Sequence, residues 1–471
     1  MSYVAGVDSS TQGCKVVIRD VRSGAVVREG SASHPDGTEI DPAHWWQALT
    51  DALDSAGGLD DVVALSVGAQ QHGMVVLDDD GQVIRPALLW NDTRSAQAAE
   101  DLLGEIGEEA FADQTGSVPV ASFTITKLRW LRDHEPDNAR KVAAVCLPHD
   151  WLTWRLLGYG PEESSPKGPD LAALVTDRSD ASGTGYFNPR TGHYVDAFIE
   201  TALGHVPVLP RIVEPGEQAG QTPEGVVVAC GAGDNAAAAL GLGATPGDVV
   251  VSIGTSGTVF SVSAVGTHDS AGLVAGFADA SGAFLPLACT LNAARVLDRT
   301  RDLLGVTFEE FEALALSAAP GSEGLVMVPY FEGERTPNLP EATGSLAGVT
   351  LNNWTPQNLA RAAVEGVLFS LAHGLKAVTD EGVEPERLLI IGGAAKNTAV
   401  QAIAPTIFPY PIVVPEAGEY VAWGAAVQAA WAHQGHRPDW KPQGTELPQT
   451  GHNPDLLARY LEVVASVYGV S

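Results

Sequence analysis

Cysteine is scarce in this sequence: its 471 residues contain four, Cys14, Cys146, Cys230 and Cys289, and none belongs to a CxxC pair. This spacing predicts neither a zinc site nor a disulfide framework. A chain with so few thiols fits a reducing compartment, so we expect it in the cytoplasm.

Basic residues are also few, with 27 Lys and Arg against 58 Asp and Glu, and the formal net charge is −31. Such a field repels phosphate backbones and anionic membrane surfaces, so neither nucleic acid nor a membrane is an expected partner. An anionic ligand would have to be held by a local device, such as the backbone N–H groups of a tight turn.

Long apolar runs are absent as well. The longest, Val226 to Ala244, is interrupted by Asp234 and Asn235, which makes it unsuited to span a membrane. The first ten residues, MSYVAGVDSS, contain neither the basic nor the apolar region of a secretion signal. With 45% hydrophobic and 18% charged residues, the composition is that of a soluble, packed protein, and the length predicts two to four domains.

One pattern occurs twice. Residues 3–18 and residues 249–262 each consist of an apolar strand, a turn of small polar residues and a second β-branched strand. The turns align when Gly13 is set on Gly257, 244 residues later, a little over half the chain length. We therefore expect a duplicated domain, with residues 1–244 as the first copy and 245–471 as the second. The breaker cluster GATPG at 243–247 supports that boundary.

Strands and helices alternate in both halves, which predicts an α/β fold with mixed sheets that open on hairpins. Asp41 and Pro42 supply a cap and a first-turn proline for a helix that ends near Ser55. Further helices are expected from 234, over 358–379, after 396 and over 421–432. Strands are expected over 62–67, 74–77, 226–230, 388–391 and 412–414.

The first hairpin turn has the residues of a phosphate and metal site. Asp8 ends the first strand, where a carboxylate can hold Mg²⁺, and Ser10, Thr11 and Gln12 offer N–H groups and hydroxyls to phosphate oxygens. Lys15 adds a cation. An ordinary polar turn is the alternative.

The second hairpin turn strengthens the first interpretation, because Gly254, Thr255 and Ser256 include no acid. If both turns face one cleft, they can grip a triphosphate from two sides.

Two further turns lie between a strand and a helix. In the first, CGAGDN at 230–235, Asp234 is a candidate base toward a substrate hydroxyl, or else only a helix cap. The second, which contains Gly392, Gly393, Ala394 and Asn397, allows a ribose or a flat ring to approach the backbone. Tight packing of the strand on the helix would explain it equally well.

Several mixed polar clusters follow predicted strands, as a polyol site requires, because each buried hydroxyl must find a partner. Each cluster alone is also compatible with a capped turn. The clusters are QQHG at 70–73, WNDTR at 90–94, DRSD at 177–180 and GERTP at 333–337. The segment at 158–170, rich in Pro, Gly, Ser and acid, is expected to be a surface insertion; a lid or an oligomer contact is the alternative.

In this order the motifs resemble the FGGY family of carbohydrate kinases, of the actin-like ATPase superfamily, and most closely its members that act on D-xylulose. The resemblance covers nearly the whole chain. Its motifs are DSSTQGCKV, QQHGMV, LWNDTRS, DRSDASGT, GAGDNAAAALG, SIGTSGT, GERTPN and IGGAAKN.

The resemblance implies two actin-like, ribonuclease H-like domains with a ligand cleft between them: a sugar-binding domain at 1–244 and a nucleotide-binding domain at 245–471. It makes Asp234 the catalytic base and Asp8 a carboxylate near Mg²⁺. ATP would lie between the hairpins with its adenosine against 392–397, and a homodimer is plausible. The residues implied on the sugar side are Gln71, His72, Asn91, Asp92, Arg94 and Asn235.

The implied reaction is transfer of the γ-phosphoryl group of Mg-ATP to the C5 hydroxyl of D-xylulose. Gln71 stands where the family often has Met, which leaves the ketose open. The alternatives are a family kinase for another ketose or polyol, and a nucleotide switch without a small-molecule acceptor. A binding protein without activity is disfavoured, because Asp8 and Asp234 are both present.

Overall fold

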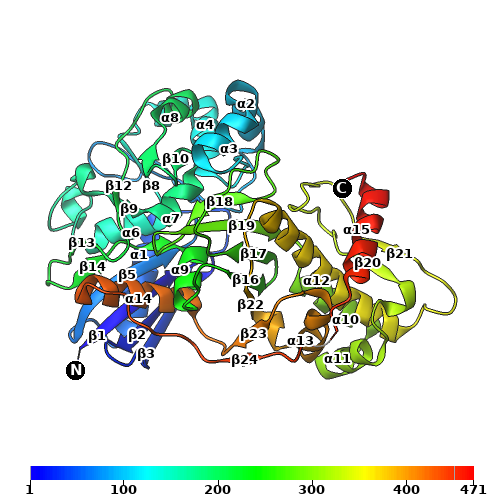
Figure 1. Cartoon of the computed structure of the whole chain (residues 1–471). Helices are drawn as coiled ribbons and strands as arrows, with labels where there is room; N and C mark the ends of the chain where they lie inside the picture. The colour runs from blue at the N-terminus through cyan, green and yellow to red at the C-terminus, as the bar shows by residue number, and fades with distance from the viewer. Residues whose placement is uncertain (1, 450, 471) are drawn as a thin grey trace.

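The computed structural model describes residues 2–449 and 451–470, and its core is formed by two seven-stranded sheets that lie side by side (Figure 1). In the N-terminal sheet, β1 to β3 form an antiparallel meander, while β5 is parallel to both β1 and β14. In spatial order its strands are β13 (Gln218–Gln221), β14 (Val227–Ala229), β5 (Val62–Ala69), β1 (Tyr3–Ser9), β2 (Gly13–Asp20) and β3 (Val26–Ser33), with β15 (Ala232–Gly233) also beside β5.

The C-terminal sheet repeats this arrangement. Its hairpin β16–β17 is extended antiparallel by β19 on one side and parallel by β22 and β23 on the other. The spatial order is β18 (Ala275–Ala278), β19 (Phe284–Thr290), β17 (Gly257–Ser261), β16 (Asp248–Ile253), β22 (Arg387–Ile391), β23 (Ile412–Pro415) and β24 (Gly444–Glu446). The series β3-β2-β1-β5-β14 thus matches β19-β17-β16-β22-β23, which confirms the predicted duplication and the α/β class.

The predicted elements are present with small changes at their ends. Asp41 caps α1 through its side chain, which accepts a hydrogen bond from Ala43 N at 2.9 Å. The helices are α1 (Pro42–Ser55), α2 (Ala96–Ile106), α3 (Glu108–Thr115), α4 (Thr124–His134), α5 (Pro136–Ala139), α6 (Pro148–Leu156), α7 (Arg178–Ala181), α8 (Asp196–Leu203), α9 (Asp234–Gly241), α10 (Ala294–Leu304), α11 (Phe308–Ser317), α12 (Pro356–Asp380), α13 (Thr398–Ile407), α14 (Tyr420–Gln434) and α15 (Pro454–Tyr468).

Small two-stranded sheets complete the structure. They pair β4 (Glu39–Ile40) with β7 (Ala87–Leu88), β6 (Val75–Leu77) with β8 (Ala144–Cys146), β9 (Val175–Asp177) with β12 (Arg211–Val213), β10 (Phe187–Asn188) with β11 (His193–Tyr194), and β20 (Val326–Val328) with β21 (Ser345–Ala347).

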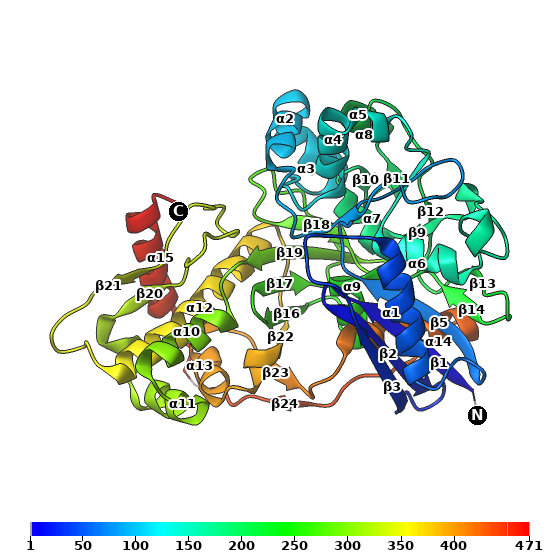
Figure 2. The same ribbon diagram turned by 180° about the vertical axis from the view of Figure 1, so that it is seen from behind.

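Helices cover both faces of the N-terminal sheet. Figure 1 shows α9 and α14 in front of its strands, and Figure 2, from behind, shows α1 over the opposite face. Helix α14 comes from the second half of the sequence but packs on β1 and β5 of the first. Its approach depends on glycines: a Cβ on Gly6 would lie 1.8 Å from Ala422 O, and one on Gly424 would lie 1.8 Å from Ala237 O.

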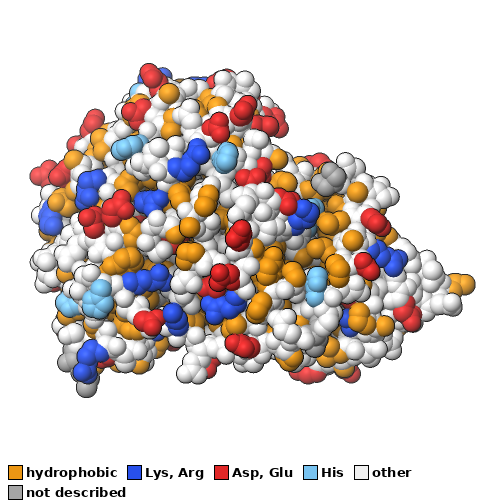
Figure 3. Space-filling model, in the orientation of Figure 1, with side chains coloured by type: hydrophobic (Ala, Val, Ile, Leu, Met, Phe, Trp, Pro, Cys, Tyr) orange, Lys and Arg blue, Asp and Glu red, His pale blue; other side chains and the backbone are white. Residues whose placement is uncertain are grey.

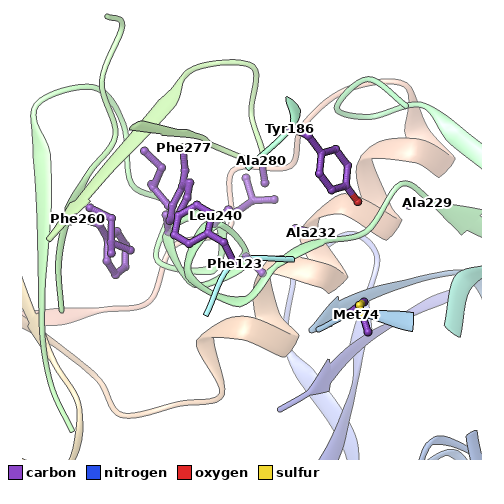
Figure 4. Packing of buried hydrophobic residues seen from close by; sticks show 14 of the residues in the cluster. Met74, Phe123, Tyr186, Ala229, Ala232, Leu240, Phe260, Phe277 and Ala280 are labelled. Carbon is purple, nitrogen blue, oxygen red and sulfur yellow. The ribbon is translucent and has the colours of Figure 1, made fainter. Parts of the chain in front are cut away.

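One hydrophobic core runs through the junction of the two halves. It contains Phe123 and Leu240 from the first half and Phe260 and Phe277 from the second (Figure 4). The rings of Phe123 and Phe277 have centroids 6.1 Å apart. The two halves are therefore packed on each other through a continuous apolar core.

Acidic and basic side chains are interspersed over the face drawn in Figure 3. No helix in residues 2–449 and 451–470 has both the length and the apolar composition needed to cross a membrane. The segment at 158–170 is held against α6 by Arg155, whose Nη2 donates to Ser164 O at 2.9 Å. Within the segment, Lys167 N donates to Gly158 O at 3.0 Å. It thus forms an ordered surface loop, which fits the expected insertion.

Candidate active site

A cavity of about 250 Å³ opens where the two sheets meet, and both predicted carboxylates line it. Asp8 comes from the end of β1 and Asp234 from the first turn of α9. The lining residues are Asp8, Asp234, Asn235, Ala238, Ser252, Phe260, Ile391, Gly418, Glu419, Tyr420 and Val421. The cavity is therefore shared by the two halves of the chain, as a cleft between duplicated domains requires.

The Asp8 side chain is buried, with 8% exposed. Its Oδ1 is buried and has no hydrogen-bond partner among the described residues. Burial, together with the nearby negative charge of Asp234, raises the pKa of Asp8 to about 7. Such a carboxyl can bind a cation, because a positive ion would restore the charged form that burial disfavours.

Asp234 is half-buried and begins α9 after Gly233, which occupies the cap position. The carboxylate does not act as an N-cap; its Oδ1 accepts from Asn235 N at 2.7 Å and from Asn235 Nδ2 at 2.9 Å. Burial raises the pKa of Asp234 to about 6, against these two bonds. A carboxylate with this pKa is mostly charged at neutral pH and basic enough to take a proton.

Gln71 and His72 follow β5 and lie behind the same turn. A Cβ on Gly233 would lie 2.7 Å from Gln71 Nε2, so the amide is packed directly against the residue before Asp234. Gln71 Nε2 also donates to Ser179 O at 3.3 Å, and Ser179 Oγ accepts from Gly233 N at 3.1 Å. Gln71, one of the two predicted sugar-side neighbours, is thus joined to the turn that carries Asp234.

His72 is held as a neutral ring. Its Nδ1 lies 2.6 Å from Gly183 O, which can only accept, so Nδ1 carries the proton and Nε2 is an acceptor. Burial, with the charge of Lys127, lowers the pKa of His72 to about 3. The ring packs on Phe123, with centroids 4.8 Å apart, and on Phe277 at 5.9 Å.

Asp92 and Arg94 are engaged with each other. Asp92 Oδ1 accepts from Arg94 Nε at 2.8 Å, and its Oδ2 accepts from Thr38 Oγ1 at 2.7 Å. Arg94 also pairs with Glu39 at 3.0 Å, and neither residue lines the cavity. Asn91, next to this pair, keeps a buried Oδ1 without a partner in the described part of the chain.

The turn of the first hairpin is closed on itself. Ser10 Oγ donates to Gly13 O at 3.0 Å. Gln12 is exposed, and its backbone carbonyl accepts from His34 N at 2.9 Å. Thr11 Oγ1 donates to Gln70 Oε1 at 3.4 Å and accepts from Trp90 Nε1 at 2.9 Å. Thr11 thus joins the turn to two of the predicted polar clusters.

Lys15 does not stand free beside this turn. Its Nζ lies 2.6 Å from Glu419 Oε2. Glu419 lines the cavity just before α14 and was not among the predicted residues, although it has the same signal as Asp234: an acid at the start of a helix that follows a strand.

The second hairpin turn is exposed at Thr255 and Ser256. Gly254 O accepts from Ala294 N at 2.9 Å, so the turn is fastened to the start of α10. A Cβ on Gly257 would lie 2.5 Å from Thr290 Oγ1. This second turn therefore reaches solvent at its tip, while its base is closely packed.

The glycine turn after β22 shows the tight packing expected of it, and its contact with a nucleotide stays a prediction. Gly392 has a φ of 94°, and a Cβ there would lie 2.6 Å from Ile253 O, so tight packing requires this glycine. Gly393 has open space where a Cβ would be, and Ala394 is half-exposed. Asn397 caps α13 through Oδ1, which accepts from Ala399 N at 2.9 Å and from Val400 N at 3.0 Å.

A buried charged group behind the site was not foreseen. His149 Nδ1 lies 2.6 Å from Asp180 Oδ2, and Asp150 is also adjacent. Burial opposes the charged imidazole, but Asp150 and Asp180 raise the pKa of His149 to about 10. Asp177, in the same predicted cluster, caps α7. The DRSD motif therefore forms the wall behind Asp234, with its carboxylates paired or capping.

Comparison with known proteins agrees with this geometry. The model of the FGGY family of carbohydrate kinases, N-terminal domain, matches residues 3–241, and that of the C-terminal domain matches residues 249–433. A xylulose kinase of Streptomyces rubiginosus is 46% identical over 454 residues, which cover 92% of this chain and 89% of that protein.

Solved structures show the same fold. The crystal structure of xylulose kinase from Bifidobacterium adolescentis superimposes with a TM-score of 0.92 at 43% identity, covering 98% of this chain and 99% of that one. A gluconate kinase from Lactobacillus acidophilus has a TM-score of 0.88 at 23% identity, covers 99% of each chain and shows the fold alone. The duplicated sheets are therefore those of the actin-like, ribonuclease H-like ATPase fold, and the chain belongs to the FGGY family of carbohydrate kinases.

Proposed function

We propose that this protein transfers the γ-phosphoryl group of ATP to the C5 hydroxyl of D-xylulose, giving D-xylulose 5-phosphate. The observation that carries the proposal is the cavity between the two halves, where Asp8 and Asp234 meet. The choice of sugar rests on the relatives named xylulose kinase, two of which, from Streptomyces, are 46% identical to this chain.

Asp234 is proposed as the general base. Its two hydrogen bonds from Asn235 both go to Oδ1, which leaves Oδ2 for the substrate hydroxyl. With a pKa of about 6, the carboxylate is charged at neutral pH and can accept the proton as the hydroxyl attacks. Base catalysis of this kind contributes about 10²–10⁴ in rate, and positioning of the in-line groups supplies most of the rest.

Asp8 is proposed to hold Mg²⁺. The fit rests on its buried, unpartnered Oδ1 and on a carboxyl whose pKa of about 7 allows ionisation as a cation arrives. When bound, Mg²⁺ would neutralise negative charge on the transferred phosphoryl group. The backbone N–H groups of Thr11, Gln12 and the Gly254–Ser256 turn would contact phosphate oxygens, and Gly392–Asn397 would border the adenosine. The N–H of Ser10 already donates to Gly13 O at 3.0 Å.

On the sugar side we propose His72 and Gln71 as direct contacts. Because burial lowers the pKa of His72 to about 3, its Nε2 is an acceptor at neutral pH, so it suits a sugar hydroxyl that donates. Asn235 would contact the sugar beside Asp234, with Asn91 Oδ1 as a further acceptor. Asp92 and Arg94, which bind each other, would then shape the wall of the site.

We infer that the sugar-binding and nucleotide-binding domains meet near residue 245. The gap between the two matched segments, 242–248, and the separate sheets support this boundary. Helix α14 qualifies the division, since it packs on the N-terminal sheet. A homodimer stays a prediction from the resemblance, and light scattering of the purified protein would test it.

A coupled ADP-release assay tests the activity. Mg-ATP is supplied with D-xylulose, D-ribulose, L-ribulose, L-xylulose, glycerol, gluconate and several alditols, for the wild type and for Asp234→Ala. D-xylulose is expected to stimulate ADP release most, and Asp234→Ala is expected to lose at least about a hundredfold while still binding ATP. If another polyol stimulates ADP release more strongly, that polyol replaces D-xylulose as the proposed substrate. ADP release that no sugar changes would favour the nucleotide switch.

A further inference from the structure

Lys127 is a fully buried basic residue of the N-terminal half. It lies in the first turn of α4, and none of its side chain is exposed. No carboxylate of the described residues forms an ion pair with it; its Nζ instead donates to His72 O at 2.8 Å and to Ser122 O at 2.5 Å. An ammonium group buried against carbonyl oxygens alone is costly, so the fold must gain something specific from its place.

The backbone of His72 explains what is gained. His72 has a φ of 70°, in the left-handed region, and within residues 2–449 and 451–470 it is one of three non-glycine residues with a positive φ. This conformation is strained for a residue with a Cβ and persists where neighbouring groups hold it. Two donors converge on the His72 carbonyl: Lys127 Nζ, and Thr124 Oγ1 at 3.2 Å.

The same conformation sets the direction of the imidazole. The ring is fixed by the bond from Nδ1 to Gly183 O and by its packing on Phe123 and Phe277. Gly183 allows this approach, since a Cβ there would lie 2.8 Å from His72 Nδ1. If the carbonyl of His72 were released, the peptide could relax to negative φ and turn the ring away from these partners.

We propose that Lys127 is a positioning residue for sugar recognition: through the carbonyl of His72 it holds the imidazole with Nε2 toward the substrate. The proposal rests on the proposed contact between His72 and the sugar. Asp92 has a part in it: burial lowers the pKa of Lys127 to about 7, and the negative charge of Asp92 opposes this shift and so favours the charged ammonium. The Asp92–Arg94 pair does not line the cavity, but through Asp92 it would support Lys127 and so contribute to the site.

Steady-state kinetics of Lys127→Met test the proposal, with D-xylulose and ATP varied in turn. Because a charge-assisted hydrogen bond is lost, KM for the sugar is expected to rise at least about tenfold, while KM for ATP stays within about twofold. Thr124→Val, which removes the weaker donor and no charge, is expected to raise KM for the sugar by a smaller factor. Thr126→Val, a buried hydroxyl in the same turn that does not reach His72, is the matched control and leaves both constants unchanged.

A double-mutant cycle separates this inference from the function on which it rests. If Lys127 acts through His72, then Lys127→Met adds nothing to KM for the sugar in a His72→Ala background. If Lys127→Met and His72→Ala raise KM for the sugar by independent factors that multiply in the double mutant, the proposal is wrong. An unchanged sugar KM in both Lys127→Met and Thr124→Val would also overturn it. If His72→Ala itself leaves KM for D-xylulose unchanged, the sugar contact proposed above is the part that fails. Should Lys127→Met not fold, the same cycle is run with Thr124→Val.

Discussion

Asp8→Asn is expected to stabilise the protein at alkaline pH and to leave its stability unchanged at acid pH. The pKa of Asp8 is raised from an ordinary 3.8 to about 7 by burial and by Asp234. Folding therefore favours the protonated carboxyl, so the wild type loses stability as pH rises from about 4 through 7. The neutral amide of Asn carries no such loss.

The size of this stability difference follows from the pKa shift of Asp8. About three pKa units at roughly 1.4 kcal/mol each give an upper bound of about 4 kcal/mol at pH 8, and almost nothing at pH 4. Chemical denaturation of both proteins at pH 5, 6.5 and 8 measures the difference. Asp36→Asn, at an exposed site, controls for the loss of one charge.

Added Mg²⁺ makes the same experiment sharper. A cation bound at Asp8 favours the charged form, so it should stabilise the wild type at pH 8 and leave Asp8→Asn unchanged. The difference in free energy of unfolding between the two proteins should therefore become smaller. If Asp8→Asn is equally stable relative to the wild type at pH 5 and pH 8, the buried, uncompensated carboxylate described above does not exist. If the gap is present but Mg²⁺ does not narrow it, the proposed metal site is wrong while the burial argument stands.

Three further predictions concern the base, the helix junction and a buried ion pair. Because the pKa of Asp234 is about 6, kcat at saturating sugar should fall about tenfold per unit below pH 6; a profile flat to pH 5 would contradict it. Gly6→Ala should prevent stable folding, since its Cβ would overlap a carbonyl oxygen of α14, whereas Gly104→Ala, at an open helical site, should keep or raise the melting temperature. Arg361→Met should cost about 3 kcal/mol in denaturant unfolding, because it leaves the buried Glu365 without its 2.7 Å partner; a cost below about 1 kcal/mol would show that backbone donors suffice.

Local signals were sufficient for the scaffold of the site. The alternation of apolar residues and the small polar turn predicted both hairpins, and Gly13 and Gly257 do begin the second strand of each. The meeting of Asp8 with Asp234 was also predictable, because carboxyl ends of parallel strands in an open α/β sheet face one edge. Here β15 lies parallel to β5, which is parallel to β1, so both acids reach that edge.

Long-range contacts explain where prediction stopped. Lys15 was expected beside phosphate, but the structure pairs it with Glu419, more than 400 residues away. Nothing near Lys127 in the sequence indicates that its ammonium reaches the carbonyl of His72, since this depends on the angle at which α4 meets the loop after β5. The docking of α14 on β1 likewise requires a complementarity between Gly6 and Ala422 that neither segment has alone.

The same long-range contacts join the acidic cavity to the packing of α14. Glu419 directly precedes α14, and α14 packs on the strand that carries Asp8 and on the helix that begins with Asp234. A change of charge at Asp8 therefore occurs beside the contacts of α14 with β1 and α9, where glycine and alanine pack with no spare space. Since burial keeps Asp8 partly protonated at neutral pH, arrival of a cation would release a proton and create a buried charge at that junction. If Mg²⁺ binds at Asp8 as proposed, its binding is linked to the packing of α14, so variants that loosen α14 without touching the cavity should weaken Mg²⁺ binding as well as stability.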